Sequence, residues 1–143
     1  MAENQTDDAI TETMPVPSTR ISTRQGWIAG RPRAVIEAVQ RALLTGLLIP
    51  EHDRCIFLQE FDDDALITPP TKGPQYTVIE ITLFSGRSLD AKRRLYQAIS
   101  DELALFDVPA ADIKVVLIEV DPENWGLSGK PASEIDLGFK IDV

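Results

Sequence analysis

Few residues of this chain combine a reactive side chain with a spacing that would by itself indicate a catalytic or metal-binding site. His52, the only histidine, adjoins Asp53 and could exchange protons near pH 7, but its place in a helix-to-strand turn predicts a solvent-exposed residue. Acids at 62–64 suggest a metal site only weakly, since no histidine is spaced to complete it, and a solvated acidic turn is the better interpretation. Cys55 opens an apolar run, which favours a buried core thiol over a reactive one.

Two familiar catalytic patterns do not fit. No serine stands in a triad relation to His52, and Gly86 belongs to no phosphate loop, because neither a glycine-rich fingerprint nor a following Lys-Ser/Thr is present. Trp27 and Trp125 could wall a pocket for a planar acid, although packing in the core or between subunits explains them equally well. We therefore expect neither a metal nor a cofactor.

Residues 77–121 predict a strand, a helix and a second strand, the unit around which the chain is organised. In residues 77–83 the apolar side chains alternate with Glu80 and Thr82, as in a half-buried strand, and residues 113–120 form the second strand. Ser88 is a good helix N-cap. The predicted helix carries apolar residues at helical spacing, namely Leu89, Tyr96, Ile99, Leu103 and Phe106.

Residues 17–61 predict a similar unit. A strand at 18–24 starts at about Pro17 or lies on an edge, because proline cannot donate to a sheet ladder. A helix runs from Arg31 or Pro32 to about Leu48, and a strand occupies 55–61. The apolar stripe of this helix is Val35, Ile36, Val39, Leu43 and Leu47.

The two units look like a duplication. Gly26 and Gly86 precede the two helices, and Pro-x-x-Asp elements ending at Asp53 and Asp112 follow them, about 60 residues apart in both cases. We expect an α/β (α+β) fold in which two β-α-β units form a four-stranded mixed sheet with both helices on one face. The second face is expected to be apolar and buried against another subunit.

The chain is expected to hold one domain behind a disordered extension. Residues 1–16 are polar and acidic without apolar periodicity, which is typical of disorder. The domain, residues 17–143, divides into a first unit at 17–61, a loop at 62–76, a second unit at 77–121 and a C-terminal hairpin or arm at 122–143. Phe139 and Ile141 alternate with polar residues there, as in an edge strand or an intersubunit arm.

Composition narrows the function classes. A formal charge of −9 argues against nucleic acid as a partner, since phosphate neutralisation needs clustered Lys and Arg. The sequence has no apolar run near the roughly 18 residues of a membrane span and no signal-like N-terminus, so we expect a cytoplasmic protein without a membrane partner. A small anionic substrate held by one or two local arginines stays compatible with this charge.

The order of these motifs resembles the tautomerase superfamily, and within it the longer, fused members that are like malonate semialdehyde decarboxylase. The resemblance covers roughly residues 17–132. The residues that carry it are the run Pro50-Glu51-His52-Asp53-Arg54, the turn Ser85-Gly86-Arg87-Ser88 with Lys92 and Tyr96 downstream, and Glu123-Asn124-Trp125-Gly126.

The resemblance implies a homotrimer of packed sheets with helices outside, in which an N-terminal proline acts as base or acid. By position, the proline is Pro17, the assisting aspartate is Asp53 and the carboxylate-binding arginine is Arg87, while Ser85 and Trp125 are further candidate contacts of the substrate. A desolvated secondary amine suits proton shuttling between enol and keto forms. The alternatives are a surface ion pair with an acid such as Asp90 for Arg87, and a plain turn or cap residue for Asp53.

Two positions depart from the family pattern. Ser85 stands where the decarboxylases have a second arginine. Pro17 follows sixteen residues, and an internal proline is a tertiary amide without a basic lone pair. Translation from Met14 could expose Pro15, processing could expose Pro17, or the proline chemistry could be lost.

The predicted function is proton transfer, a keto–enol tautomerisation, on a small 2-oxo or enol carboxylic acid. Two alternatives stay open. One is a noncatalytic trimeric binding or assembly module with a blocked proline, and the other is a hydratase or decarboxylase that uses Asp53 and Arg87 on an acid like malonate semialdehyde.

Overall fold

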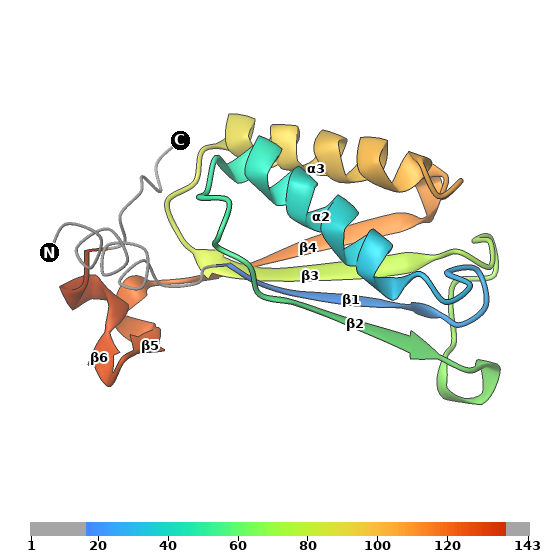
Figure 1. Cartoon of the computed structure of the whole chain (residues 1–143), viewed down its shortest axis with the longest axis horizontal. Helices are drawn as coiled ribbons and strands as arrows, with labels where there is room; N and C mark the ends of the chain where they lie inside the picture. Colours follow the sequence, from blue (N-terminus) through green and yellow to red (C-terminus); the bar gives the residue numbers. More distant parts are fainter. Residues whose placement is uncertain (1–16, 137–143) are drawn as a thin grey trace, which may run out of the picture.

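The computed structural model of this chain describes residues 17–136. The predicted extension at 1–16 and the predicted strand around Phe139 and Ile141 lie outside the described residues. No helix of the described part is both long and apolar enough to cross a membrane. The main elements are β1 (Ser18–Arg24), α2 (Pro32–Leu47), β2 (Ile56–Phe61), β3 (Thr77–Phe84), α3 (Leu89–Ala104) and β4 (Ile113–Val120), followed by a hairpin of β5 (Gly126–Leu127) and β6 (Lys130–Pro131) (Figure 1).

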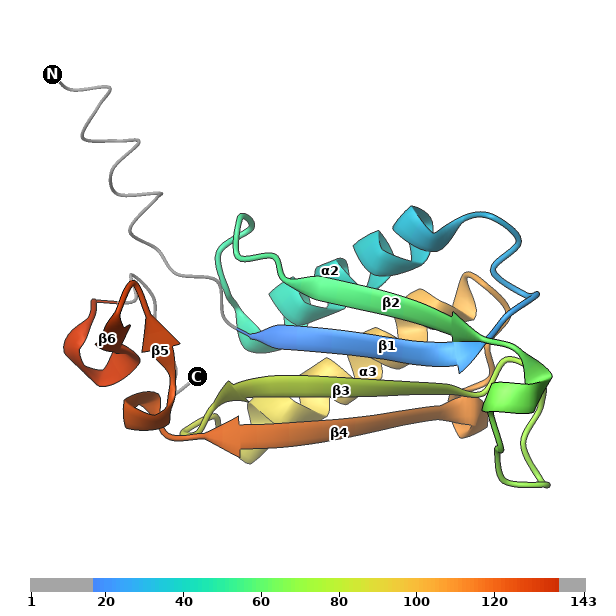
Figure 2. The same ribbon diagram turned by 90° about the horizontal axis from the view of Figure 1, so that it is seen from below.

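The four long strands form one mixed sheet in the order β2-β1-β3-β4, and both helices cover the same face (Figures 1 and 2). Each unit pairs its own strands in parallel, and the units join through the antiparallel pair β1–β3, in which Ile21 lies opposite Ile79. The predicted fold class, two β-α-β units with their helices on one face, is confirmed. Pro17 lies just before β1, so this central strand can accommodate a preceding proline.

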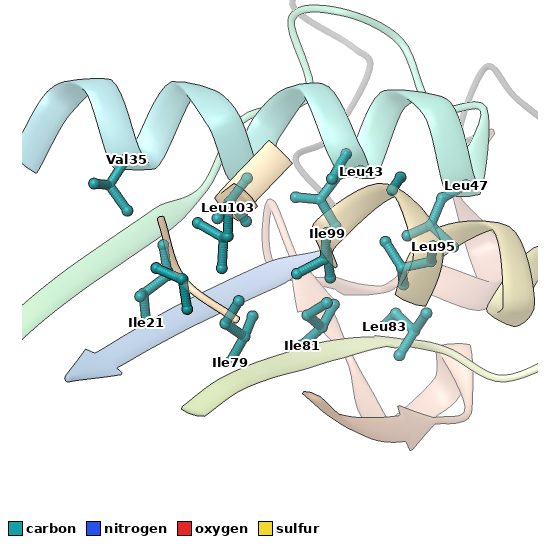
Figure 3. Close-up of a cluster of buried hydrophobic side chains, with 14 of the residues drawn as sticks. Ile21, Val35, Leu43, Leu47, Ile79, Ile81, Leu83, Leu95, Ile99 and Leu103 are labelled. Carbon is teal, nitrogen blue, oxygen red and sulfur yellow. The ribbon is translucent and has the colours of Figure 1, made fainter. Parts of the chain in front are cut away.

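The core lies between the helices and the sheet (Figure 3). The stripe predicted for the first helix is buried except for Ile36, which is half-buried. For α3 the predicted stripe was partly wrong, because Leu89 and Tyr96 are 59% and 41% exposed. The buried side chains of α3 are Ala91, Leu95, Ala98, Ile99 and Leu103.

Contact between the two helices explains why α3 buries Leu95 and exposes Tyr96. A Cβ atom built on Gly46 would lie 2.5 Å from the Cα atom of Leu95. The absence of a side chain at Gly46 therefore lets α3 approach α2 with Leu95 inward. Because the side chains of a helix repeat every 3.6 residues, an inward Leu95 turns the neighbouring Tyr96 outward.

The sheet face without helices is mixed, and the expectation that it is apolar was wrong. Strand alternation sends Ile21, Ile79 and Ile81 to the core, so the residues between them face the other way. The central strands therefore place Arg20 and Glu80 on this face as cross-strand neighbours. Apolar side chains lie toward its edges: Phe57, Val116 and Ile118 are all exposed.

Candidate active site

Loops at one end of the sheet carry all the predicted site residues. Because β1 and β2 run antiparallel to β3 and β4, the starts of the first pair meet the ends of the second pair (Figure 2). Backbone hydrogen bonds hold this end together, with Thr19 N donating to Cys55 O at 2.9 Å and Ser85 N donating to Val120 O at 3.1 Å. The predicted residues brought to this end are Pro17 before β1, Asp53 before β2, Ser85 and Arg87 after β3, and Trp125 after β4.

Arg87 lies just before α3 and is only 8% exposed. Its Nη1 donates a 2.6 Å hydrogen bond to the carbonyl of Leu47, the last residue of α2, so the guanidinium caps that helix. Burial lowers the pKa of the Arg87 guanidinium, the charge of Asp53 opposes this by raising it, and Arg94 lowers it further. Within residues 17–136, Arg87 Nε has no hydrogen-bond partner.

Neighbouring arginines take other partners. Arg94 Nη2 donates to the carbonyl of Gly46 at 3.1 Å and so also caps α2, while Arg93 pairs with Asp90 at 2.8 Å. The alternative in which Arg87 forms a surface ion pair with Asp90 does not match this geometry. Arg87 is instead an internal cation that faces the end of α2.

Asp53 closes the turn between α2 and β2 and is 2% exposed. Its backbone N–H donates to Pro50 O at 3.0 Å, and its own carbonyl accepts from Gln40 Nε2 at 3.1 Å. Both backbone polar groups of Asp53 are therefore held, which fixes the backbone of this turn. Gln40 was not among the predicted site residues; the signal that could have identified it is a glutamine inside the apolar stripe of the first helix.

Ser85 and Trp125 are both half-buried at this end of the sheet, Ser85 just after β3 and Trp125 between β4 and β5. Ser85 Oγ donates to Asp121 at 2.7 Å. Trp125 packs edge-to-face on Phe84, with 4.8 Å between ring centroids. Trp125 walls a hollow of about 360 Å³, lined also by Ser18, Thr82, Val120, Asn124 and Gly126.

Pro17 is buried where the chain enters β1, and Ser18, its neighbour, lines the hollow beside Trp125. Its nitrogen forms the amide bond with Val16 and is not basic in this chain. Pro17 therefore cannot act as a base as long as that amide bond is intact.

Comparison with known proteins decides the family. The family model described as "Tautomerase enzyme" matches residues 53–128, just over half of the chain. The chain belongs to this tautomerase family. The matched stretch includes Asp53, Ser85, Arg87 and Trp125, and leaves out Pro17 and Gln40.

Three relatives show how far the likeness extends. This tautomerase family member is 32% identical over 57 residues to "Probable tautomerase RSp0893" of Ralstonia nicotianae, a match that covers 39% of the chain and 81% of the relative. It is similar to the FG41 malonate semialdehyde decarboxylase inhibited by 3-bromopropiolate, at 27% identity and a TM-score of 0.68, over 78% and 88% of the two chains. A likeness to the F6 fused 4-OT asymmetric trimer, at 22% identity and a TM-score of 0.72 over 81% and 96% of the chains, shows the fold.

The other candidate residues of this tautomerase family member are His52, Cys55 and Trp27. His52 is exposed, as predicted. Cys55 is half-buried at the start of an edge strand, with its Sγ 3.7 Å from Ser18 Oγ, so the prediction of a core thiol was wrong. Trp27 donates through Nε1 to Thr23 Oγ1 at 2.9 Å at the opposite end of the sheet and shares no pocket with Trp125.

The acidic loop has a local structural use. Asp62 accepts hydrogen bonds from the backbone N–H groups of Asp64 and Ala65, and Asp63 pairs with Arg24. Across the described part of the chain, no three His, Cys, Asp or Glu side chains are grouped in a way that could hold a metal ion.

Proposed function

We propose that this protein catalyses keto–enol tautomerisation of a small 2-oxo or enol carboxylic acid. The observation that carries the proposal is that two ionisable residues, Asp53 and Arg87, are both buried at the sheet end where Pro17 enters β1. A buried arginine suits a carboxylate, because its N–H groups form strong charge-assisted hydrogen bonds with anions.

Each residue has a defined part in the proposed reaction. A free amine at Pro17 takes the proton of the enol hydroxyl, and the resulting ammonium returns a proton to the neighbouring carbon, so that the enol becomes a ketone without net proton change. Arg87 Nε–H binds the substrate carboxylate, and Asp53 orients the reacting oxygen or a water molecule. Ser85 and Trp125 border the substrate on the side of the hollow.

The assembly belongs to the same proposal. The fused 4-OT relative is described as a trimer, and Phe57, Val116 and Ile118 leave exposed apolar surface on the face without helices. We expect a homotrimer that buries this face and adds residues to the pocket. A cytoplasmic location, and the absence of membrane and nucleic-acid partners, complete the proposal.

The decisive experiment determines the intact mass and N-terminal sequence of the protein from its native host and then measures phenylenolpyruvate ketonisation with the same material. A chain that begins at Pro15 or Pro17 and ketonises the substrate would support a proline base. A chain with an acylated Pro17 nitrogen and no ketonisation would contradict it and favour the noncatalytic binding module.

A hydratase or decarboxylase function is the second candidate, favoured by the 27% identity to a malonate semialdehyde decarboxylase. Ser85, which is bound to Asp121, occupies the place of the second arginine of that enzyme type and weighs against it. This candidate predicts turnover of malonate semialdehyde that survives an acylated Pro17 nitrogen and is lost in Arg87→Ala.

A further inference from the structure

Gln40 is a polar residue on the otherwise apolar buried face of α2. The other buried residues of this helix, which the structure describes in full, are all apolar or glycine. Gln40 is only 3% exposed. Buried polar side chains are retained where their hydrogen bonds specify a geometry that an apolar residue could not.

The Gln40 amide is only half satisfied. Its Nε2 donates to the Asp53 carbonyl at 3.1 Å, while its Oε1 has no hydrogen-bond partner among the residues that the structure describes. A buried oxygen without a partner lowers stability. A leucine or methionine would avoid that unpartnered oxygen but would leave the Asp53 carbonyl without this donor, so the glutamine is what ties the Asp53 turn to α2.

Both charged residues of the candidate site are anchored to the same helix. Gln40 holds the backbone of Asp53 from the middle of α2, and Arg87 binds the carbonyl of Leu47 at the end of α2. Asp53 in turn acts on the charge of Arg87. The relative placement of the two side chains thus depends on the contact between Gln40 and Asp53.

We propose that Gln40 is a positioning residue, which holds the Asp53 turn so that the Asp53 carboxylate and the Arg87 guanidinium face the substrate in register. The proposal rests on the proposed function in so far as Asp53 and Arg87 form its site. Gln40 itself does not touch the substrate, and it lies outside the stretch that the family model matches.

The opposite end of the sheet supplies a matched control. Gln75 Nε2 donates to the carbonyl of Phe106, just after α3, at 2.9 Å. Gln75 therefore makes the same kind of bond, a side-chain amide to a carbonyl in the loop after a helix, but far from the candidate site. Loss of either bond removes one amide donor from a loop carbonyl.

The test compares Gln40→Met with Gln75→Met in the full chain purified from its native host. Methionine keeps the length of glutamine and removes the donor. Two readouts are recorded: kcat and KM for phenylenolpyruvate ketonisation, and the NMR resonance of Arg87 Nε–H, which neither glutamine contacts. Thermal melts show whether each variant folds, and Gln40→Leu is the second variant if Gln40→Met does not.

We expect Gln40→Met to lower kcat about tenfold with little change in KM, because misplaced catalytic groups cost rate more than binding. The Arg87 Nε–H resonance should shift in Gln40→Met and stay in place in Gln75→Met. Equal kcat values in the two variants, with the Arg87 resonance unmoved in both, would overturn the proposal.

The two readouts separate this proposal from the proposed function. If the wild-type protein does not ketonise phenylenolpyruvate, the proposed function fails, and the Arg87 resonance alone decides the role of Gln40. If wild type and Gln40→Met turn over equally, the function stands and Gln40 is only a structural residue.

Discussion

The two ends of the sheet carry corresponding positions of the two β-α-β units, yet the residues at these positions differ in their chemistry. At one end, Pro17 precedes the strand β1, Asp53 follows the helix α2, and Arg87 precedes the helix α3. At the other end the equivalent places, about 60 residues along or back in the chain, belong to Thr77, Asp112 and Trp27. The buried arginine of the candidate site thus lies at one end only, and a tryptophan takes the equivalent place at the other.

Hydrogen bonding shows the difference most directly. At the Thr77 end, Thr77 Oγ1 lies 3.1 Å from Thr23 Oγ1 and 2.8 Å from Gln75 O, within hydrogen-bond distance of both, and Asp112 accepts from Gly73 N. At the Pro17 end, buried atoms without a hydrogen-bond partner within residues 17–136 include Thr19 Oγ1, Gln40 Oε1 and Arg87 Nε. Thr77 and Asp112 are thus bonded within the protein, whereas the buried polar atoms named at the Pro17 end lack a hydrogen-bond partner in the described part of the chain.

The largest effect is expected at Arg87. Arg87→Ala removes the buried cation and should lower kcat/KM for ketonisation by about 10³-fold, the upper range for losing one key donor. Arg94→Ala is the control, because Arg94 also caps α2, through Gly46 O, without joining the site. Steady-state kinetics of both variants test this, and similar losses would show that Arg87 acts only as a helix cap.

Replacing each of the two equivalent aspartates, Asp53 and Asp112, by asparagine compares the two ends of the sheet directly. Asp53→Asn should lower kcat/KM by roughly 10²-fold, as expected when a group that orients a proton transfer loses its charge. Asp112→Asn should leave activity unchanged and lower the free energy of unfolding by about 1 kcal/mol, because it weakens the bond from Gly73 N. Kinetics and chemical denaturation of both variants measure this; an inactive Asp112→Asn would place chemistry at both ends.

Gly46 tests the helix contact at the Pro17 end. Gly46→Ala puts a Cβ within 2.5 Å of Leu95 Cα, so α3 must move away from α2. We expect the free energy of unfolding to fall by about 1–3 kcal/mol, the usual cost of overpacking. Urea denaturation measures it, and a stability equal to wild type would show that the helices part without strain.

The smallest effect concerns the residues that follow the two helices, Leu48 and Asp107, both with positive φ, at 55° and 64°. Leucine is disfavoured in the left-handed region, whereas aspartate tolerates it better. Leu48→Gly should therefore raise the free energy of unfolding by about 0.5–1 kcal/mol, and Asp107→Gly by less. Thermal melts of the pair check the order, which a larger gain at Asp107 would contradict.

Local patterns were enough to predict the architecture. Alternation in residues 77–83, the Ser88 cap, the repeated Pro-x-x-Asp elements and the spacing of the two glycine turns are all written in neighbouring residues. A parallel β-α-β connection has so few stable arrangements that these patterns imply the sheet. The assignments of Pro17, Asp53, Arg87, Ser85 and Trp125 to roles came from the family resemblance, and those roles stay predictions.

Only the tertiary structure decided what depends on contacts between distant segments. The close approach of Gly46 to Leu95 set the rotation of α3, and the pairing of β1 with β3 brought Arg20 beside Glu80 on the face without helices. The contact between Gln40 and Asp53 joins a helix to the turn that follows it, thirteen residues on. Periodicity shows that such a residue is buried, but its partner is set by packing of the whole chain.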